Sequence, residues 1–275
     1  MNYFKTFTLM AVLTVVFVII GSYFGGSNGM FYAFSFAVLM NFFSYWFSDK
    51  IVLSLYGAKE VKREDAKDLY VIVSNLSSKA GIPMPKIYIV NEKMANAFAT
   101  GRNPEHAAVA VTTGILEILT PKQLEAVLAH EITHIKNRDV LIGTIAATFA
   151  GAITMLARFA MFFGGSRDNN KGGAVGMILM MILAPLAAIL IQMAISRSRE
   201  YVADSGAAEL TGRPAELVGA LEVLYASVKK RPAGPEAQPA TAHMFIVNPF
   251  SGDFLSSLFS THPTLQQRKD NLNKV

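Results

Sequence analysis

A long stretch without charge constrains this chain more than any other feature. No Asp, Glu, Lys or Arg occurs between Thr6 and Ser48, and a glycine-rich segment at residues 21–29 interrupts the apolar run. Each half approaches the roughly 20 apolar residues that a helix needs to cross a bilayer. A cleaved signal peptide is the alternative, but the first run is longer than a signal core and a second run follows at once. We therefore expect a retained transmembrane hairpin over residues 1–50.

The overall composition agrees with a membrane protein that has a modest water-facing part. Charged residues make up 16% of the chain, against about 25% in soluble domains. The net charge is +5, but the aromatic residues lie in apolar runs rather than among the Lys and Arg residues. This pattern argues against nucleic acid as a partner and favours a lipid bilayer with anionic headgroups. The absence of Cys excludes disulfides and thiolate metal sites.

A metal-binding motif follows in residues 126–139, which read AVLAHEITHIKNRD. Thr120 and Pro121 are typical of a helix start, and the apolar residues after them recur with a helical period. On a helix, His130 and His134 lie one turn apart on the same face, so both imidazoles can reach one metal ion, for which zinc is the usual choice. Glu131 is placed to take a proton from a water that the metal activates. The alternative is a surface helix that carries two His by chance.

A second charge-poor region begins directly after this motif. Apart from Arg158, residues 140–163 are uncharged, and residues 172–196 are uncharged as well, with a polar turn between the two runs. We expect a second transmembrane hairpin over residues 141–196. Basic residues flank both hairpins, and the segment at residues 21–29 has none. The positive-inside rule therefore predicts that the N-terminus, residues 51–140 and residues 197–275 all face the cytosol.

A candidate for the third metal ligand lies just beyond the second hairpin, in residues 198–204, which read SREYVAD. Two His and one Glu form a common catalytic zinc set, and Glu200 returns to the neighbourhood of His130 if the hairpin closes. Asp204, one helical turn later, could hold the outer nitrogen of a ligating His. A solvated charge beside neighbouring arginines is the alternative for Glu200. The extended motif that supplies a third His is absent, since its position holds Val140.

A small sheet is expected before the motif helix. Residues 64–80 have the pattern of an amphipathic helix, and residues 86–90, 95–100 and 107–112 have the composition of short strands. Asn96, Ala97 and Phe98 could form an edge strand beside the metal, where an extended peptide would bind through its backbone. An ordinary internal strand is the alternative. Further helices are expected at residues 200–210, at residues 214–228 and from Pro263, so the fold class is mainly α with a small β-sheet.

The motifs taken together resemble the HtpX family of membrane-bound zinc endopeptidases, which are relatives of the CAAX prenyl endopeptidases. The resemblance covers HEITHIKNRD, the pair of apolar spans, SREYVAD and the Thr-His-Pro sequence at residues 261–263. It implies one zinc per chain bound by His130, His134 and Glu200, with Glu131 catalytic. It also implies a polytopic protein of the bacterial inner membrane, with a gluzincin-like metalloprotease domain at the membrane surface and its site facing the cytoplasm. Misfolded or membrane proteins would be its substrates, in quality control and the stress response.

The resemblance also divides the chain and bears on His262. Residues 1–50 and 141–196 would form the two hairpins, and residues 51–140 and 197–275 the two parts of the catalytic domain. His262 could donate a hydrogen bond to the oxyanion near the scissile carbonyl, or it could cap or pack against the last helix. Spacing does not separate these roles, and the resemblance favours the site.

Two competing functions are less well supported than peptide hydrolysis. An intramembrane-cleaving protease needs its motif inside a span, but Lys122, Glu125 and Lys136 flank this one and indicate a position at the membrane surface. A non-catalytic scaffold with structural zinc needs four protein ligands, and the sequence offers three clear candidates. The leading hypothesis is therefore a zinc endopeptidase.

Overall fold

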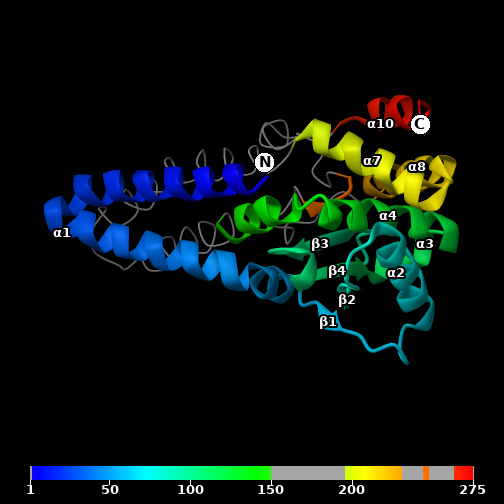
Figure 1. Cartoon of the computed structure of the whole chain (residues 1–275), viewed down its shortest axis with the longest axis horizontal. Coiled ribbons are helices and arrows are strands. Elements are labelled where there is room, and N and C mark those ends of the chain that lie inside the picture. Colours follow the sequence, from blue (N-terminus) through cyan, green and yellow to red (C-terminus); the bar gives the residue numbers. More distant parts are fainter. Residues whose placement is uncertain (1, 150–195, 231–243, 248–262, 275) are drawn as a thin grey trace.

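The computed structural model describes residues 2–149, 196–230, 244–247 and 263–274, and these are mainly helical with one small mixed sheet, as predicted (Figure 1). The elements in chain order are α1 (Asn2–Leu55), β1 (Lys59–Glu60), α2 (Lys67–Ala80), β2 (Lys86–Val90), β3 (Ala97–Gly101), η1 (Pro104–His106), β4 (Ala107–Thr112), α3 (Thr113–Ile118), α4 (Pro121–Lys136), α7 (Arg197–Thr211), α8 (Pro214–Lys230) and α10 (Leu265–Leu272). A further helical stretch covers Val140–Phe149.

The first element, α1, is a helical hairpin rather than one rod (Figure 1). The chain reverses at Gly26, whose φ of 58° and ψ of −142° break the helix. Near this reversal the two arms touch, because a Cβ at Gly21 would lie 2.4 Å from Cβ of Ala33 and one at Gly29 would lie 2.2 Å from the carbonyl oxygen of Gly21. The glycine-rich segment therefore brings the two apolar arms together.

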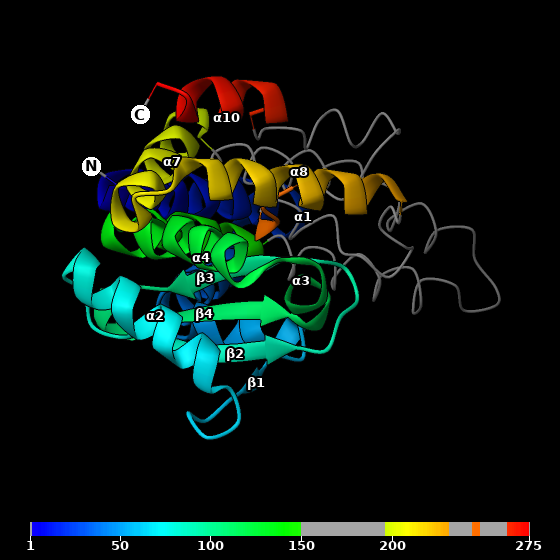
Figure 2. The same cartoon turned by 90° about the vertical axis from the view of Figure 1, so that its right-hand side faces the viewer.

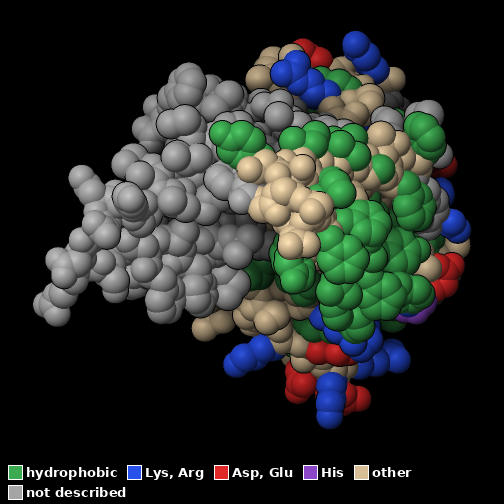
Figure 3. All heavy atoms as spheres, turned by 90° about the vertical axis from the view of Figure 1, so that its left-hand side faces the viewer, with side chains coloured by type: hydrophobic (Ala, Val, Ile, Leu, Met, Phe, Trp, Pro, Cys, Tyr) green, Lys and Arg blue, Asp and Glu red, His purple; other side chains and the backbone are tan. Residues whose placement is uncertain are grey.

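Both arms of α1 are long and apolar enough to cross a membrane, over Thr6–Tyr23 and Gly25–Leu55. Large hydrophobic side chains cover their outer surface, as the view from the hairpin end shows (Figure 3). Phe31 and Tyr32 are 65% and 71% exposed. A contiguous apolar surface of this kind is typical of a face that meets lipid or a partner rather than water.

The sheet has the strand order β1-β2-β4-β3, with β2 and β4 parallel and the outer strands antiparallel to their neighbours. Alternate residues of β4 face opposite sides, so Val109 belongs to the core with α2 and α4, and Ala110 packs with Val52 of α1. β3 lies at the edge of the sheet and begins at Ala97. The predicted strands are all present, and the predicted helix at residues 64–80 begins three residues later, at Lys67.

The motif helix α4 lies between the sheet and the layer formed by α7 and α8 (Figure 2). Its start is a capping box, in which the Thr120 hydroxyl accepts from the Gln123 N–H at 3.3 Å and the Gln123 side chain accepts from the Thr120 N–H at 3.0 Å. Leu128 and Ile132 are fully buried. The predicted N-terminal cap and helical period of this segment are confirmed.

The second hairpin predicted for residues 141–196 lies mostly outside the described residues. Its first part, Val140–Phe149, is helical and packs against the first arm of α1. This contact is formed by Leu9, Leu13, Leu141, Ile142, Ile145 and Phe149. The division of the chain into two hairpins and two catalytic parts stays a prediction.

Candidate metal centre

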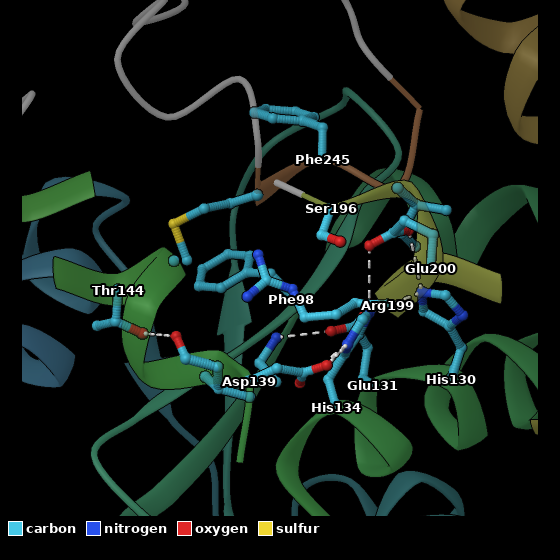
Figure 4. A pocket seen from close by; sticks show the side chains of 15 residues that line it. Phe98, His130, Glu131, His134, Asp139, Thr144, Ser196, Arg199, Glu200 and Phe245 are labelled. Carbon is cyan, nitrogen blue, oxygen red and sulfur yellow. Dashed lines mark hydrogen bonds and ion pairs between the residues drawn. The ribbon is translucent and has the colours of Figure 1, made fainter. Parts of the chain in front are cut away.

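Three side chains from two helices meet in one cavity (Figure 4). His130 and His134 project from α4, and their Nε2 atoms are 3.1 Å apart. Glu200 projects from the first turn of α7, with one carboxylate oxygen 3.7 Å from Nε2 of His130 and the other 3.5 Å from Nε2 of His134. The chain therefore brings Glu200 back to the motif helix, as the sequence predicted.

The spacing of these donor atoms fits a tetrahedral metal ion. Zinc holds nitrogen and oxygen ligands at about 2.0–2.1 Å, which sets neighbouring ligand atoms roughly 3.3 Å apart. The two Nε2 atoms are 3.1 Å apart, and the two different carboxylate oxygens of Glu200 lie 3.7 Å from His130 and 3.5 Å from His134, close to that value. Two imidazole nitrogens and one carboxylate oxygen also form a donor set that a divalent metal accepts. The residues present therefore fit a bound metal ion.

The outer nitrogen of His130 is held by a buried ion pair. Oδ1 of Asp204 lies 2.9 Å from Nδ1 of His130, and Nε of Arg268 on α10 donates to Oδ2 of Asp204 at 2.9 Å. Burial alone would raise the pKa of Asp204, but Arg268 and His130 together outweigh it and keep that pKa below its usual value. An ionised Asp204 accepts a hydrogen bond from the Nδ1–H group, so the lone pair of Nε2 is free to bind a metal ion.

The outer nitrogen of His134 also meets a carboxylate. Both oxygens of Asp139 lie 3.1 Å from Nδ1 of His134. Burial alone would lower the pKa of His134, but Asp139 and Glu200 raise it to about 10. This imidazole therefore lies in a strongly negative environment that favours a cation at Nε2.

Glu131 points into the same cavity and is oriented by the edge strand (Figure 4). Its Oε2 accepts a hydrogen bond of 2.8 Å from the backbone N–H of Ala99 in β3. Burial raises the pKa of Glu131, although the two imidazoles beside it act in the opposite direction. A carboxylate with a raised pKa is a stronger base than a solvated one.

The three predicted peptide-binding residues lie on β3 or directly before it, and one of them lines the cavity. Phe98 lines the cavity from β3, and Ala97 is the first residue of that strand. Asn96 precedes the strand, and its side chain is bonded to another part of the chain: Nδ2 donates to the Met244 carbonyl at 3.3 Å, and Oδ1 accepts from the Ile246 N–H at 3.1 Å. A role for these residues in binding substrate stays a prediction.

Sequence reasoning did not find several of these neighbours. Asp139 lies inside the motif of residues 126–139, five residues after His134. Residues on one face of a helix are three or four apart, so this spacing did not suggest a contact between the two. Arg268 stands in LQQRKDNL, where nothing distinguishes it from a solvated arginine, and yet it is fully buried. Met244 and Ile246 lie in a segment without a regular pattern. His262, the remaining predicted site residue, lies outside the described residues.

Comparison with known proteins agrees with this geometry. The model of "Peptidase family M48" matches residues 63–275. The chain belongs to peptidase family M48. This M48 peptidase is 52% identical to "Protease HtpX homolog" of Ralstonia pickettii (strain 12J) over 269 residues, which covers 97% of this chain and 94% of the relative. It is 54% identical to "Protease HtpX homolog" of Thermococcus sibiricus (strain DSM 12597 / MM 739) over 278 residues, or 98% and 95% of the two chains.

A solved structure shares the fold of this M48 peptidase. Ste24p of S. mikatae superposes with a TM-score of 0.53 at 19% sequence identity. The match covers 99% of this chain but only 65% of the Ste24p chain, so it shows the fold alone. The predicted HtpX resemblance is confirmed, and the chain is a metalloprotease, a hydrolase of peptide bonds. His130, His134 and Glu200 are the residues that could hold its metal ion.

Proposed function

We propose that this M48 peptidase is a membrane-anchored zinc endopeptidase that cleaves misfolded or membrane proteins at the cytosolic face of a bacterial inner membrane. The observation that carries the proposal is the meeting of three metal-donor atoms and one buried carboxylate, Glu131, in a single cavity. Its physiological role would be protein quality control during stress.

Zinc is the proposed metal, one ion per chain, held by His130, His134 and Glu200. Two imidazoles and one carboxylate form a common catalytic zinc set, which leaves a fourth position open. When bound there, zinc would act as a Lewis acid, lowering the pKa of the attacking water and polarising the scissile carbonyl. A structural role is less well supported, because a structural site is closed by a fourth protein ligand.

Glu131 is the proposed general base. It would take a proton from the attacking water and pass it to the leaving amine. Its carboxylate is fixed by the Ala99 N–H, so it faces the cavity in one orientation and retains its other oxygen for the water. His262 is proposed as a further donor to the oxyanion that forms at the scissile carbonyl.

The outer edge of β3 is the proposed binding surface for substrate. Because the Ala99 N–H points to Glu131, the edge of the strand that lies away from β4 faces the reacting groups. An extended peptide can add to such an edge through its backbone, with Phe98 beside it in the cavity. Only an unfolded stretch of a substrate protein can adopt that conformation, which agrees with misfolded proteins as substrates.

The membrane assignment rests on α1. Its two apolar arms are mostly exposed, and basic residues lie near and just beyond the end of the second arm, at Lys50 and Lys59. Under the positive-inside rule this charge distribution supports a cytosolic position for the cavity. A protease cleavage site inserted after Lys62 tests this topology. In sealed right-side-out inner-membrane vesicles the site should be protected from added protease, and cleavage there would contradict the topology.

The activity is tested by cleavage of unfolded casein with the full chain in detergent, alongside Glu131→Gln. The substitution should lower the rate by roughly 10²–10⁴-fold and leave one zinc per chain. Glu117→Gln, at an exposed position of α3, is the matched control and should keep the full rate. If Glu131→Gln cleaves casein at the wild-type rate, the proposed mechanism is wrong.

A further inference from the structure

The chain makes an unusual turn immediately after the motif helix. Arg138 has a φ of 57° and is the one residue other than glycine, among those the structure describes, with a positive φ. Such a conformation is unfavourable for a residue with a side chain. The turn sends Asp139 back toward α4, where it is 7% exposed although it carries a carboxylate.

Asp139 contacts His134 through both its main chain and its side chain. The Asp139 N–H donates to the His134 carbonyl at 3.3 Å, which holds the two residues together at the end of the helix. The carboxylate then spans Nδ1 of His134, with both oxygens at 3.1 Å. This contact orients the ring so that Nε2 faces His130 and Glu200 (Figure 4).

We propose that Asp139 is a positioning residue that fixes the tautomer and orientation of His134 for metal binding, an inference that rests on the proposed metal centre. Each ligating imidazole then has its own buried carboxylate, Asp204 for His130 and Asp139 for His134. Partners of this kind raise the basicity of the ligand and hold its ring. The strained turn at Arg138 delivers Asp139 to the ring.

A purely structural role is the alternative for Asp139, because it directly precedes the helical stretch Val140–Phe149 and occupies the N-cap position. Two substitutions separate the roles. Asn and Ser both cap helices well. Asn has the length of Asp, so its amide oxygen can still accept a hydrogen bond from Nδ1–H of His134. Ser is too short to reach this group.

The test measures metal binding without activity. The full chain is purified in detergent and stripped of metal, its zinc dissociation constant is measured by competition with a chelator, and the visible spectrum of the cobalt-loaded protein is recorded. Asp139→Ser should weaken zinc binding about 10–100-fold and shift the cobalt spectrum. Asp139→Asn should stay within about threefold of the wild type and keep its spectrum, since the acceptor is preserved.

Wild-type zinc binding and an unchanged cobalt spectrum in Asp139→Ser would overturn the inference. If that variant does not fold, the zinc-loaded wild type decides: with ¹⁵N-labelled His, the Nδ1 proton of His134 should be observed and exchange slowly, and its absence would overturn the inference equally. Casein cleavage by Glu131→Gln separates this result from the proposed function. Activity that does not depend on Glu131 would contradict the mechanism and leave the Asp139 result standing.

Discussion

Gly206 on α7 and Thr133 on α4 lie so close that a Cβ added to Gly206 would stand 2.4 Å from Cγ2 of Thr133. Real Cβ atoms do not approach other atoms so closely, so the two ligand-bearing helices meet at a point that only glycine permits. Gly206 follows Glu200 by less than two turns of the same helix. We therefore expect this contact to set the distance between the Glu200 carboxylate and the two imidazoles.

Gly206→Ala should push α7 away from α4 and weaken zinc binding about tenfold or more, with a loss of stability of about 1–3 kcal/mol from overpacking. Competition with a chelator measures the first effect, and thermal unfolding in detergent measures the second. The double variant Thr133→Ala/Gly206→Ala removes the clashing Cγ2 and should recover most of the affinity. Wild-type zinc binding in Gly206→Ala would show that this contact does not control the ligand spacing.

The ion pair between Arg268 and Asp204 should matter strongly for stability, because both side chains are fully buried. Arg268→Met leaves the carboxylate of Asp204 without its cationic partner and should destabilise the protein by about 3–5 kcal/mol. Arg268→Met/Asp204→Asn should lose less, since no charge is then left buried alone. Chemical unfolding of the three proteins measures these differences, and equal stability of Arg268→Met and wild type would contradict the assignment.

The same pair gives a pH dependence with a defined sign. The pKa of Asp204 is lower in the folded protein than in the unfolded chain, where it is about 4. The contribution of Asp204 to the free energy of unfolding is therefore fully present above about pH 4, and it is lost as the pH falls through the lower pKa of the folded protein. In Arg268→Met the burial of Asp204 raises its pKa without the opposing guanidinium, so the destabilisation relative to wild type should be smaller at pH 5 than at pH 8. An equal destabilisation at the two pH values would contradict an Asp204 that Arg268 holds ionised.

The strained turn at Arg138 should tolerate glycine and reject a β-branched residue. Arg138→Gly relieves the unfavourable φ of 57° but adds freedom to the unfolded chain, so its stability should stay within about 0.5–1 kcal/mol of the wild type. Arg138→Val has no such relief and should lose about 1–2 kcal/mol more. Thermal unfolding compares the two. Equal stability of the valine and glycine variants would contradict a turn that needs a positive φ at this position.

Removal of the metal should destabilise the water-facing part. A ligand that binds only the folded state adds about 2.7 kcal/mol to the free energy of unfolding when its concentration is 100 times its dissociation constant. A chelator should therefore lower the unfolding temperature of the wild type, and added zinc should restore it. Glu200→Gln should show a smaller response, since one ligand is weakened. An unfolding temperature that does not respond to chelator or zinc would contradict a metal site that forms only in the folded protein.

Elements with strong local signals could be predicted from the sequence. The capping sequence Thr120-Pro121, the apolar period of α4 and the β-branched composition of β2 each act over a few residues, and each produced the expected element. The pairing of Glu200 with the motif also followed from sequence, because the spacing of the two imidazoles requires a further ligand and the apolar region between them suggests a return of the chain.

Features that depend on tertiary packing could not be predicted. Arg268 is buried only because α10 covers Asp204, a contact across 64 residues of sequence. Asp139 reaches His134 through a backbone conformation that arginine rarely adopts, which no helical repeat would suggest. A glycine inside a helix weakens it, and for Gly206 the structure gives the reason in the side chain of Thr133.

X-ray diffraction at the zinc absorption edge, from crystals of the full chain grown with zinc, tests the metal centre most directly. One anomalous peak per chain should lie about 2.0–2.1 Å from Nε2 of His130, Nε2 of His134 and a carboxylate oxygen of Glu200, with no fourth protein ligand. A zinc peak that Glu200 does not contact, or one closed by four protein side chains, would contradict a catalytic site built from these residues.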